Sequence, residues 1–196
     1  PVDISRVSTG SAKPQLMLDA DGGIHVAWES ARGGTLGRVE SPAQLLYTSS
    51  LDGGVTWREP VLIQMPESEG SLRAALTIDP QGRLMIVSSA VPGNDVFYSL
   101  SNDRGQTWTL PATVADLKAS PVSALDNLTT AVDSAGRVHV VCNCSPEIRD
   151  GIYNLTHVTW DGTTWSAPDV IRQYRGDLPE WPVATIGLGN RLSVAW

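Results

Sequence analysis

The chain has 196 residues, of which 41% are apolar, and its 14 basic and 21 acidic residues give a net charge of -7. This composition permits a buried core and excludes the disordered class, and the absence of any basic run excludes a nucleic-acid partner, because phosphate neutralisation requires clustered cations. The longest apolar stretches are far shorter than the roughly 20 residues needed to cross a bilayer, so no membrane span is predicted.

Short runs of Val, Ile, Leu and Thr bounded by turn residues begin near residue 14, and no segment keeps a helical apolar period over three turns. Such runs are typical of β-strands. The first unit of the chain, residues 14–63, contains four predicted strands, at 14–19, 23–28, 44–50 and 57–63. The sequence therefore predicts an all-β fold.

The same order of strands recurs further along the chain. The second unit, residues 73–114, contains strands predicted at 73–79, 83–89, 95–101 and 108–114. The third unit, residues 127–171, contains strands predicted at 127–133, 136–142, 152–160 and 165–171. Residues 181–196 resemble the first half of a unit. Repeated units of four strands are the signature of β-propeller blades.

One turn marks the first half of each unit. Asp19, Asp79 and Asp133 each open a four-residue turn that ends in Gly and precedes an apolar strand, and residues 187–190 occupy the same place in the last unit. An Asp at this position can accept a backbone hydrogen bond from two residues on, and Gly tolerates a positive φ. These segments are therefore predicted to be hairpin turns.

A second turn, with the pattern S-x-D-x-G-x-T-W, lies between the third and fourth strands at residues 50–57 and 101–108, and a shorter copy occupies residues 159–165. Its carboxylate can accept backbone N–H bonds, its glycine permits left-handed φ, and its tryptophan can pack between units. A single carboxylate per turn is too few ligands for a hard cation, so no metal site is predicted. The turn residues are Ser50, Asp52, Gly54, Thr56, Trp57, Ser101, Asp103, Gly105, Thr107, Trp108, Asp161 and Trp165.

The two ends of the chain also match parts of the repeat. Residues 1–4 resemble residues 60–63, which predicts that they form the outer strand of a neighbouring blade. Since propellers close with about 4 to 8 blades, we expect this chain to be a single segment of a larger propeller of six or seven blades. The remaining blades of that propeller are then its expected partners, and a ring made of two such chains is an alternative.

The S-x-D-x-G-x-T-W pattern is the Asp-box, and the chain resembles the sialidase-like superfamily of Asp-box, or BNR-repeat, β-propellers. Members include exo-sialidases, other glycoside hydrolases, sorting receptors and assembly factors. In active sialidases the first strand opens with Arg-Ile-Pro, whose arginine binds the substrate carboxylate, and the next loop carries an acid/base Asp. Here Lys13 precedes Pro14, and Glu29 and Glu40 are the carboxylates of the loop at 29–44.

Candidate ligand-binding residues come from loops expected to share one face and to surround the central channel. If the chain is catalytic, the resemblance implies Glu29, Arg32 and Glu40 as candidates. Further candidates on the same face are Arg38, Glu67, Arg149, Arg172, Arg175 and Trp181. Convergent carboxylates and arginines could bind a sugar acid or hydrolyse a glycoside, and the alternative is that they are solvated loop residues.

The two cysteines, Cys142 and Cys144, are separated by one residue on a predicted strand and therefore point to the same face. Their spacing matches neither a C-x-x-C redox motif nor a four-ligand zinc site. We expect two free buried thiols, and an unusual short-loop disulfide is the alternative if the chain is exported.

These observations favour a non-catalytic module that binds a glycan or a protein, without a cofactor, in an extracellular or cell-envelope protein. The alternative is a sialidase-like exo-glycoside hydrolase whose catalytic residues lie partly outside this chain. A second alternative is a propeller of the sorting-receptor or assembly-factor type. Any export signal is expected to have been removed or to lie outside the sequence, because residue 1 does not begin one.

Overall fold

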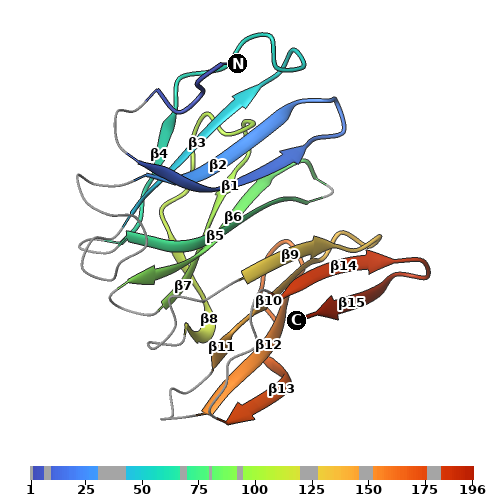
Figure 1. Ribbon diagram of the computed structural model, residues 1–196. Coiled ribbons are helices and arrows are strands. Elements are labelled where there is room, and N and C mark those ends of the chain that lie inside the picture. Colours follow the sequence, from blue (N-terminus) through green and yellow to red (C-terminus); the bar gives the residue numbers. More distant parts are fainter. Residues whose placement is uncertain are drawn as a thin grey trace.

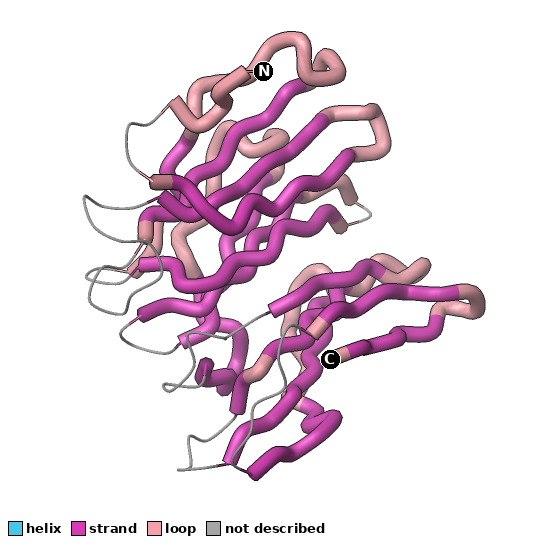
Figure 2. The backbone as a smooth tube through the Cα atoms, viewed as in Figure 1, coloured by secondary structure: helices cyan, strands magenta, loops and turns pink. Residues whose placement is uncertain are grey.

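The computed structural model describes residues 2–6, 10–30, 43–66, 70–79, 81–91, 95–119, 128–145, 152–175 and 182–196. These residues form strands and turns and contain no helix, which confirms the predicted all-β class (Figure 2). Across the same residues there is accordingly no helix long and apolar enough to cross a membrane.

Blade 1 is an antiparallel sheet with the strand order β1-β2-β3-β4. Its strands are β1 (Ser11–Leu18), β2 (Ile24–Ser30), β3 (Gln44–Ser50) and β4 (Val61–Ile63). The fourth strand begins later than the predicted residue 57. Arg58 N instead bonds Ser49 O in the turn, and Pro60 has no N–H to donate, so pairing with β3 starts at Val61.

Blade 2 has the strands β5 (Gly70–Ile78), β6 (Leu84–Val91), β7 (Asp95–Ser101) and β8 (Ala112–Ala119). The predicted fourth strand, 108–114, is displaced toward the C-terminus, because pairing begins only after Pro111. A two-residue strand, β11 (Cys144–Ser145), arrives from blade 3 and pairs with the end of β8. This pairing gives β8 a partner beyond the predicted end at residue 114.

Blade 3 has the strands β9 (Leu128–Val132), β10 (Val138–Cys142), β12 (Ile152–Trp160) and β13 (Asp169–Arg175). Here too the fourth strand starts after a proline, Pro168, rather than at the predicted residue 165. The half unit at the end of the chain is the hairpin β14 (Val183–Gly187) and β15 (Arg191–Ala195).

The sheets pack face to face in chain order (Figure 1). The side chains of β6 alternate between two buried clusters. Leu84 and Ile86 join a buried cluster with Tyr47 of blade 1, whereas Met85 and Val87 join the cluster shared with blade 3. Successive side chains of a strand point to opposite faces, so one strand contributes to two cores. Radial packing of successive blades follows from this arrangement.

The four first strands, β1, β5, β9 and β14, lie next to one another in succession. This is the hub of a β-propeller, and the predicted fold class is confirmed. The sheets do not close into a ring. Leu16 and Leu18 of β1 are 67% and 62% exposed on the free side of blade 1.

The outer strand predicted for residues 1–4 stays a prediction. Val2, Asp3 and Ile4 carry no strand pairing, although Ile4 packs against the apolar cluster of Val26 and Trp28. A fourth strand needs the third strand of its own blade as a partner, and the described residues contain none for it.

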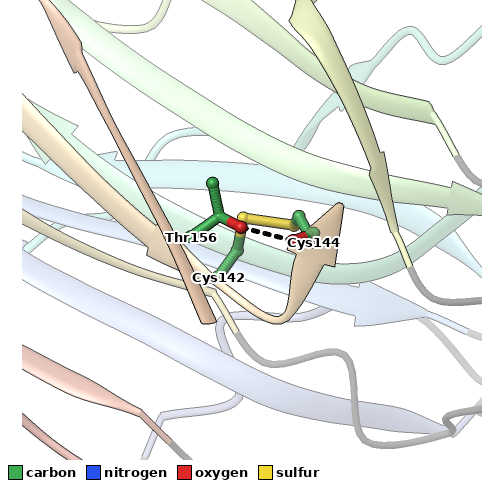
Figure 3. The surroundings of a disulfide bond; sticks show 3 residues. All are labelled: Cys142, Cys144 and Thr156. Carbon is green, nitrogen blue, oxygen red and sulfur yellow. Dashed lines mark hydrogen bonds between the residues drawn. A yellow bond between two sulfur atoms is a disulfide. The ribbon is translucent and has the colours of Figure 1, made fainter. Parts of the chain in front are cut away.

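Cys142 and Cys144 form a disulfide, so the expectation of free thiols is wrong (Figure 3). Two residues apart on a straight strand would be separated by about 6.6 Å. The chain instead turns at Asn143 to reach blade 2, which brings the two Cα atoms to 5.2 Å. That separation lies within the range that a disulfide can span, and Thr156 Oγ1 holds the turn by donating to Cys144 O at 2.5 Å.

Candidate functional site

A cavity of about 340 Å³ lies at the hub, and we name it the hub cavity. Its lining residues come from the first strands of all three blades and from the start of β14. Those that the structure describes are Lys13, Gln15, Arg73, Ala74, Leu128, Thr129, Pro182 and Val183. They lie in the first half or at the middle of these strands, and Pro182 lies just before β14.

Two cations enter this cavity from equivalent irregularities of the sheet. In β1 the pairing with β2 skips a residue between Ala12 and Gln15, and in β5 the pairing with β6 skips one between Ser71 and Arg73. Such an extra residue is a β-bulge, and it changes the direction of the side chains beside it. Lys13 itself has a φ of 53°, which is uncommon for a residue other than glycine and is found at functional sites.

Glu29 lies directly behind Lys13. It occupies β2 opposite Ala12, its side chain is only 1% exposed, and its Oε2 accepts a hydrogen bond from Lys13 Nζ at 2.8 Å. The other oxygen, Oε1, is buried and has no hydrogen-bond partner. Burial raises the pKa of Glu29, and the positive charges of Lys13 and Arg73 oppose that rise only in part.

Burial also affects the lysine. The pKa of Lys13 is lowered, chiefly because its ammonium group is partly removed from water, while Glu29 acts in the opposite direction. Counted as ionised groups, Lys13, Glu29 and Arg73 carry one net positive charge in a chain whose total charge is -7. The described residues that line the hub cavity include these two cations and no carboxylate.

Such a lining is suited to an anion. A guanidinium group can donate two parallel hydrogen bonds to a carboxylate or phosphate, and an ammonium group adds a point charge. Glycoside hydrolysis usually requires two carboxyl groups that flank the scissile bond. Among the described residues, Glu29 is the carboxylate found in contact with this group of cations.

The structure brings one of the sequence-predicted site residues, Glu29, to the hub cavity through its bond to Lys13. Arg172 and Arg175 lie on β13, the outermost strand of blade 3, where Arg172 stacks over the Tyr174 ring at 5.9 Å. They are not among the residues that line the cavity. Six other candidates lie outside the described residues: Arg32, Arg38, Glu40, Glu67, Arg149 and Trp181.

Sequence reasoning did not propose Lys13 or Arg73 as ligand-binding residues. Lys13 carried a signal, since it occupies the place before Pro14 where active sialidases have their Arg-Ile-Pro arginine. Arg73 carried none, because it belongs to no motif and reaches Lys13 only through the packing of β5 beside β1.

The Asp-box turns lie at the opposite ends of the blades and are built from their own hydrogen bonds. Asp52 Oδ1 accepts from Thr56 N at 2.8 Å and Oδ2 accepts from Thr56 Oγ1 at 2.6 Å, while Gly54 N donates to Ser50 Oγ at 2.8 Å. Asp103 repeats this arrangement with Thr107. These bonds lower the pKa of both carboxyl groups to about 2, which supports the predicted structural role.

Two of the three tryptophans of these turns, Trp108 and Trp165, pack across a blade boundary. Trp108 of blade 2 meets the ring of Tyr47 in blade 1, with centroids 5.1 Å apart. Trp165 of blade 3 likewise meets Tyr98 of blade 2 at 5.3 Å, beside the buried Trp160. The described residues contain no group of three or more His, Cys, Asp or Glu side chains that could hold a metal ion.

Two comparisons of the sequence with known proteins gave different results. The family described as BNR repeat-like domain matches residues 6–186, which is most of the chain. No curated protein matches it.

Solved structures similar to this chain include a protein of unknown function from Dyadobacter fermentans, with a TM-score of 0.66 at 16% identity over 97% of this chain and 58% of that one. An α-L-arabinofuranosidase from Fusarium graminearum gives 0.59 at 15% identity, over 89% and 51%. The NanB sialidase of Streptococcus pneumoniae gives 0.58 at 18% identity, over 92% and 26%. At these identities the similarity shows the fold, and this chain spans 58% or less of each of the three.

Proposed function

This chain belongs to the family of BNR repeat-like domains, within the sialidase-like superfamily of β-propellers, and from that premise we propose that its hub cavity binds a glycan that carries a carboxylate group. One observation carries the proposal. Lys13 and Arg73 line the cavity together, and the other lining residues that the structure describes carry no charge. A carboxylate-bearing sugar would add charge-assisted hydrogen bonds to both cations, which a neutral sugar would not.

We propose that the chain itself binds this glycan without hydrolysing it. Hydrolysis would require a second carboxyl group across the ligand, and Glu29 is held by Lys13 behind the cavity. Ligand hydroxyl groups could still be bound by Gln15 and Thr129, which also line the cavity.

A second candidate function is glycoside hydrolysis, and the buried Glu29 favours it. A carboxyl group whose pKa is raised by burial is suited to act as a general acid. The second carboxyl group would then come from Glu40, which lies outside the described residues, or from blades outside this sequence. Release of nitrophenol from nitrophenyl glycosides, abolished in the variant Glu29→Gln, would favour this candidate over simple binding.

We also propose that the protein functions outside the cytoplasm, in an extracellular or cell-envelope location. The support is the disulfide between Cys142 and Cys144, because disulfides persist mainly in oxidising compartments. The ring would be completed by further blades of the same propeller, which would cover the exposed Leu16 and Leu18 of blade 1.

Calorimetric titration tests the proposed ligand class directly. We expect galacturonic acid or N-acetylneuraminic acid to bind, and galactose and arabinose not to bind measurably. The variant Arg73→Gln should weaken acid binding by roughly tenfold or more, since a hydrogen bond to a charged group contributes about 1.5–3 kcal/mol.

The matched control is Arg172→Gln, which removes the same group from the exposed strand β13. Its affinity should equal that of the wild type. Equal binding of acidic and neutral sugars, or a loss of affinity in Arg172→Gln but not in Arg73→Gln, would contradict the assignment of the hub cavity.

A further inference from the structure

We infer that Glu29 acts as an internal competitor for the anionic ligand, so that ligand binding at Lys13 is coupled to uptake of one proton by Glu29. This inference rests on the proposed function, because it concerns the same cavity. It adds that occupancy of the cavity depends on pH through a residue that does not line it.

Lys13 lies between the carboxylate of Glu29 and the hub cavity. Lys13 lines the hub cavity, whereas Glu29 is not among its lining residues. The ammonium group is bonded at 2.8 Å to a side chain that is 1% exposed. In the free protein, therefore, the carboxylate of Glu29 already accepts from one of the three donors of Lys13 and offsets the positive charge that an anionic ligand would use.

Glu29 would lose its hydrogen-bond donor if Lys13 turned toward a ligand. Oε1 already lacks a hydrogen-bond partner, and Oε2 would lose the lysine. A buried carboxylate without partners takes up a proton rather than remain charged, because its ionised form is no longer solvated. The neutral acid is then the stable form of Glu29 in the complex.

Among the described residues, the charged groups that face Glu29 come from two neighbouring strands. They are Lys13 on β1 and Arg73 on β5, while Leu45, opposite on β3, is apolar. Arg73 is also a cavity residue, so a bound anion would offset its charge as well. Both effects of the ligand therefore favour protonation of Glu29.

The charges balance across this exchange. The ligand carboxylate replaces the Glu29 carboxylate beside Lys13, and one proton from solvent neutralises Glu29, so the net charge of the group is unchanged. No covalent bond other than the new O–H bond is formed or broken. The anion thus enters a buried site without leaving an additional uncompensated charge there.

The sign of the pH dependence follows from proton uptake. Affinity should rise as the pH falls, by up to about tenfold per pH unit for one proton. The window lies between the pKa of Glu29 in the free protein, which burial already raises, and its still higher pKa in the complex. Below that window the affinity should become constant, because Glu29 is protonated before the ligand arrives.

Calorimetry in two buffers of different ionisation enthalpy measures this proton directly, with the same two sugar acids as probes. For the wild type we expect uptake that approaches one proton per ligand bound. The variant Glu29→Gln should take up none, should bind about tenfold more tightly near neutral pH, and should lose the pH dependence.

The matched control is Glu59→Gln, which removes a carboxylate that is 79% exposed and paired with Arg6. It should behave as the wild type in every buffer. Because the buffer comparison uses the wild-type chain, it tests the inference even if Glu29→Gln fails to fold.

The outcomes separate this inference from the proposed function. If a sugar acid binds to the wild type without proton uptake, or if folded Glu29→Gln binds no more tightly than the wild type, the competitor role is overturned and the proposed ligand class stands. If neither acid binds at any pH, both are overturned.

Discussion

Two blade interfaces contain the same chain of side chains with one difference. Between blades 1 and 2, Asp19 bonds His25, which bonds the hydroxyl of Tyr47 at 2.6 Å. The second interface lies between blade 3 and the hairpin β14–β15. There Asp133 bonds His139, and His139 Nδ1 lies 2.9 Å from Nε2 of a second histidine, His157.

The strand register shows that these positions are equivalent. Tyr47 pairs with Ala27, two residues after His25, and His157 pairs with Val141, two residues after His139. The two blades therefore have the same geometry at this place. The equivalent position of the third strand is a tyrosine in blade 1 and a histidine in blade 3.

The difference decides how each interface responds to protons. A phenol hydroxyl can donate or accept, so it can meet His25 in either protonation state. Two imidazoles can share a hydrogen bond only while one of the facing nitrogens lacks a proton. The stacked pair of His139 and His157, with centroids 5.1 Å apart, is thus compatible with at most one charge.

The strongest way to break the first of these interfaces is through Gly105. A Cβ atom built on this residue would overlap the ring of Tyr47, and its φ of 79° disfavours any side chain. We expect Gly105→Ala to lower the free energy of unfolding by about 3 kcal/mol or more, because overpacking adds to backbone strain. Urea unfolding monitored by tryptophan fluorescence measures the change.

Gly54 provides the matched control for this variant. It occupies the same position of the blade 1 Asp-box with a φ of 89°, but its nearest atom would be Ile24 Cδ1 at 3.6 Å. Gly54→Ala should therefore cost only about 1 kcal/mol, the backbone term alone. Equal losses in the two variants would show that Tyr47 is not fixed by the neighbouring blade.

A smaller effect distinguishes the two aspartates. Asp133 is 1% exposed and accepts from Arg137 Nε at 2.8 Å and from Arg137 N at 2.9 Å, whereas Asp19 is 13% exposed and has no arginine of this kind. We expect Asp133→Asn to destabilise the fold by about 2–3 kcal/mol, because a buried acceptor loses the charge to which Arg137 and His139 are bonded, and Asp19→Asn by about 1 kcal/mol.

Thermal unfolding near neutral pH compares these two variants. A loss in Asp19→Asn as large as that in Asp133→Asn would indicate that the histidine bond, which both sites share, outweighs the arginine. The two interfaces would then differ in energy only through Tyr47 and His157.

The elements that could be predicted from sequence are those whose bonds are local. The Asp-box closes its hydrogen bonds within eight residues, from Ser50 to Trp57, so its pattern identifies both the turn and the repeat. The fourth strands were placed too early because the turn continues after the tryptophan until a proline, such as Pro60, has passed.

The rest depended on packing between blades. Arg73 joins Lys13 and Glu29 only because β5 lies beside β1. The disulfide forms only because the chain leaves blade 3 at Asn143 to pair with β8. Neither the packing of β5 beside β1 nor the pairing of β11 with β8 can be recognised from a regular pattern in the sequence.

The smallest expected effect tests the histidine pair itself. Burial, and then the charge of His139, lower the pKa of His157 from its ordinary value of 6.5, while Asp169 opposes this shift. The unfolded chain therefore binds more protons than the folded one as the pH falls below about 6.5. Stability should decrease through that window, by less than about 1 kcal/mol because His157 is partly exposed.

The variant His157→Tyr transfers the blade 1 arrangement to blade 3, and Tyr47→His makes the reciprocal change. Urea unfolding at several pH values between about 7 and 5 should show a shallower loss of stability in His157→Tyr than in the wild type, and a steeper loss in Tyr47→His. The slope is the quantity to compare, because Tyr47 is fully buried against Trp108 and its replacement lowers stability at every pH. Unchanged slopes in both variants would mean that the residue at this position does not set the proton response of the interface.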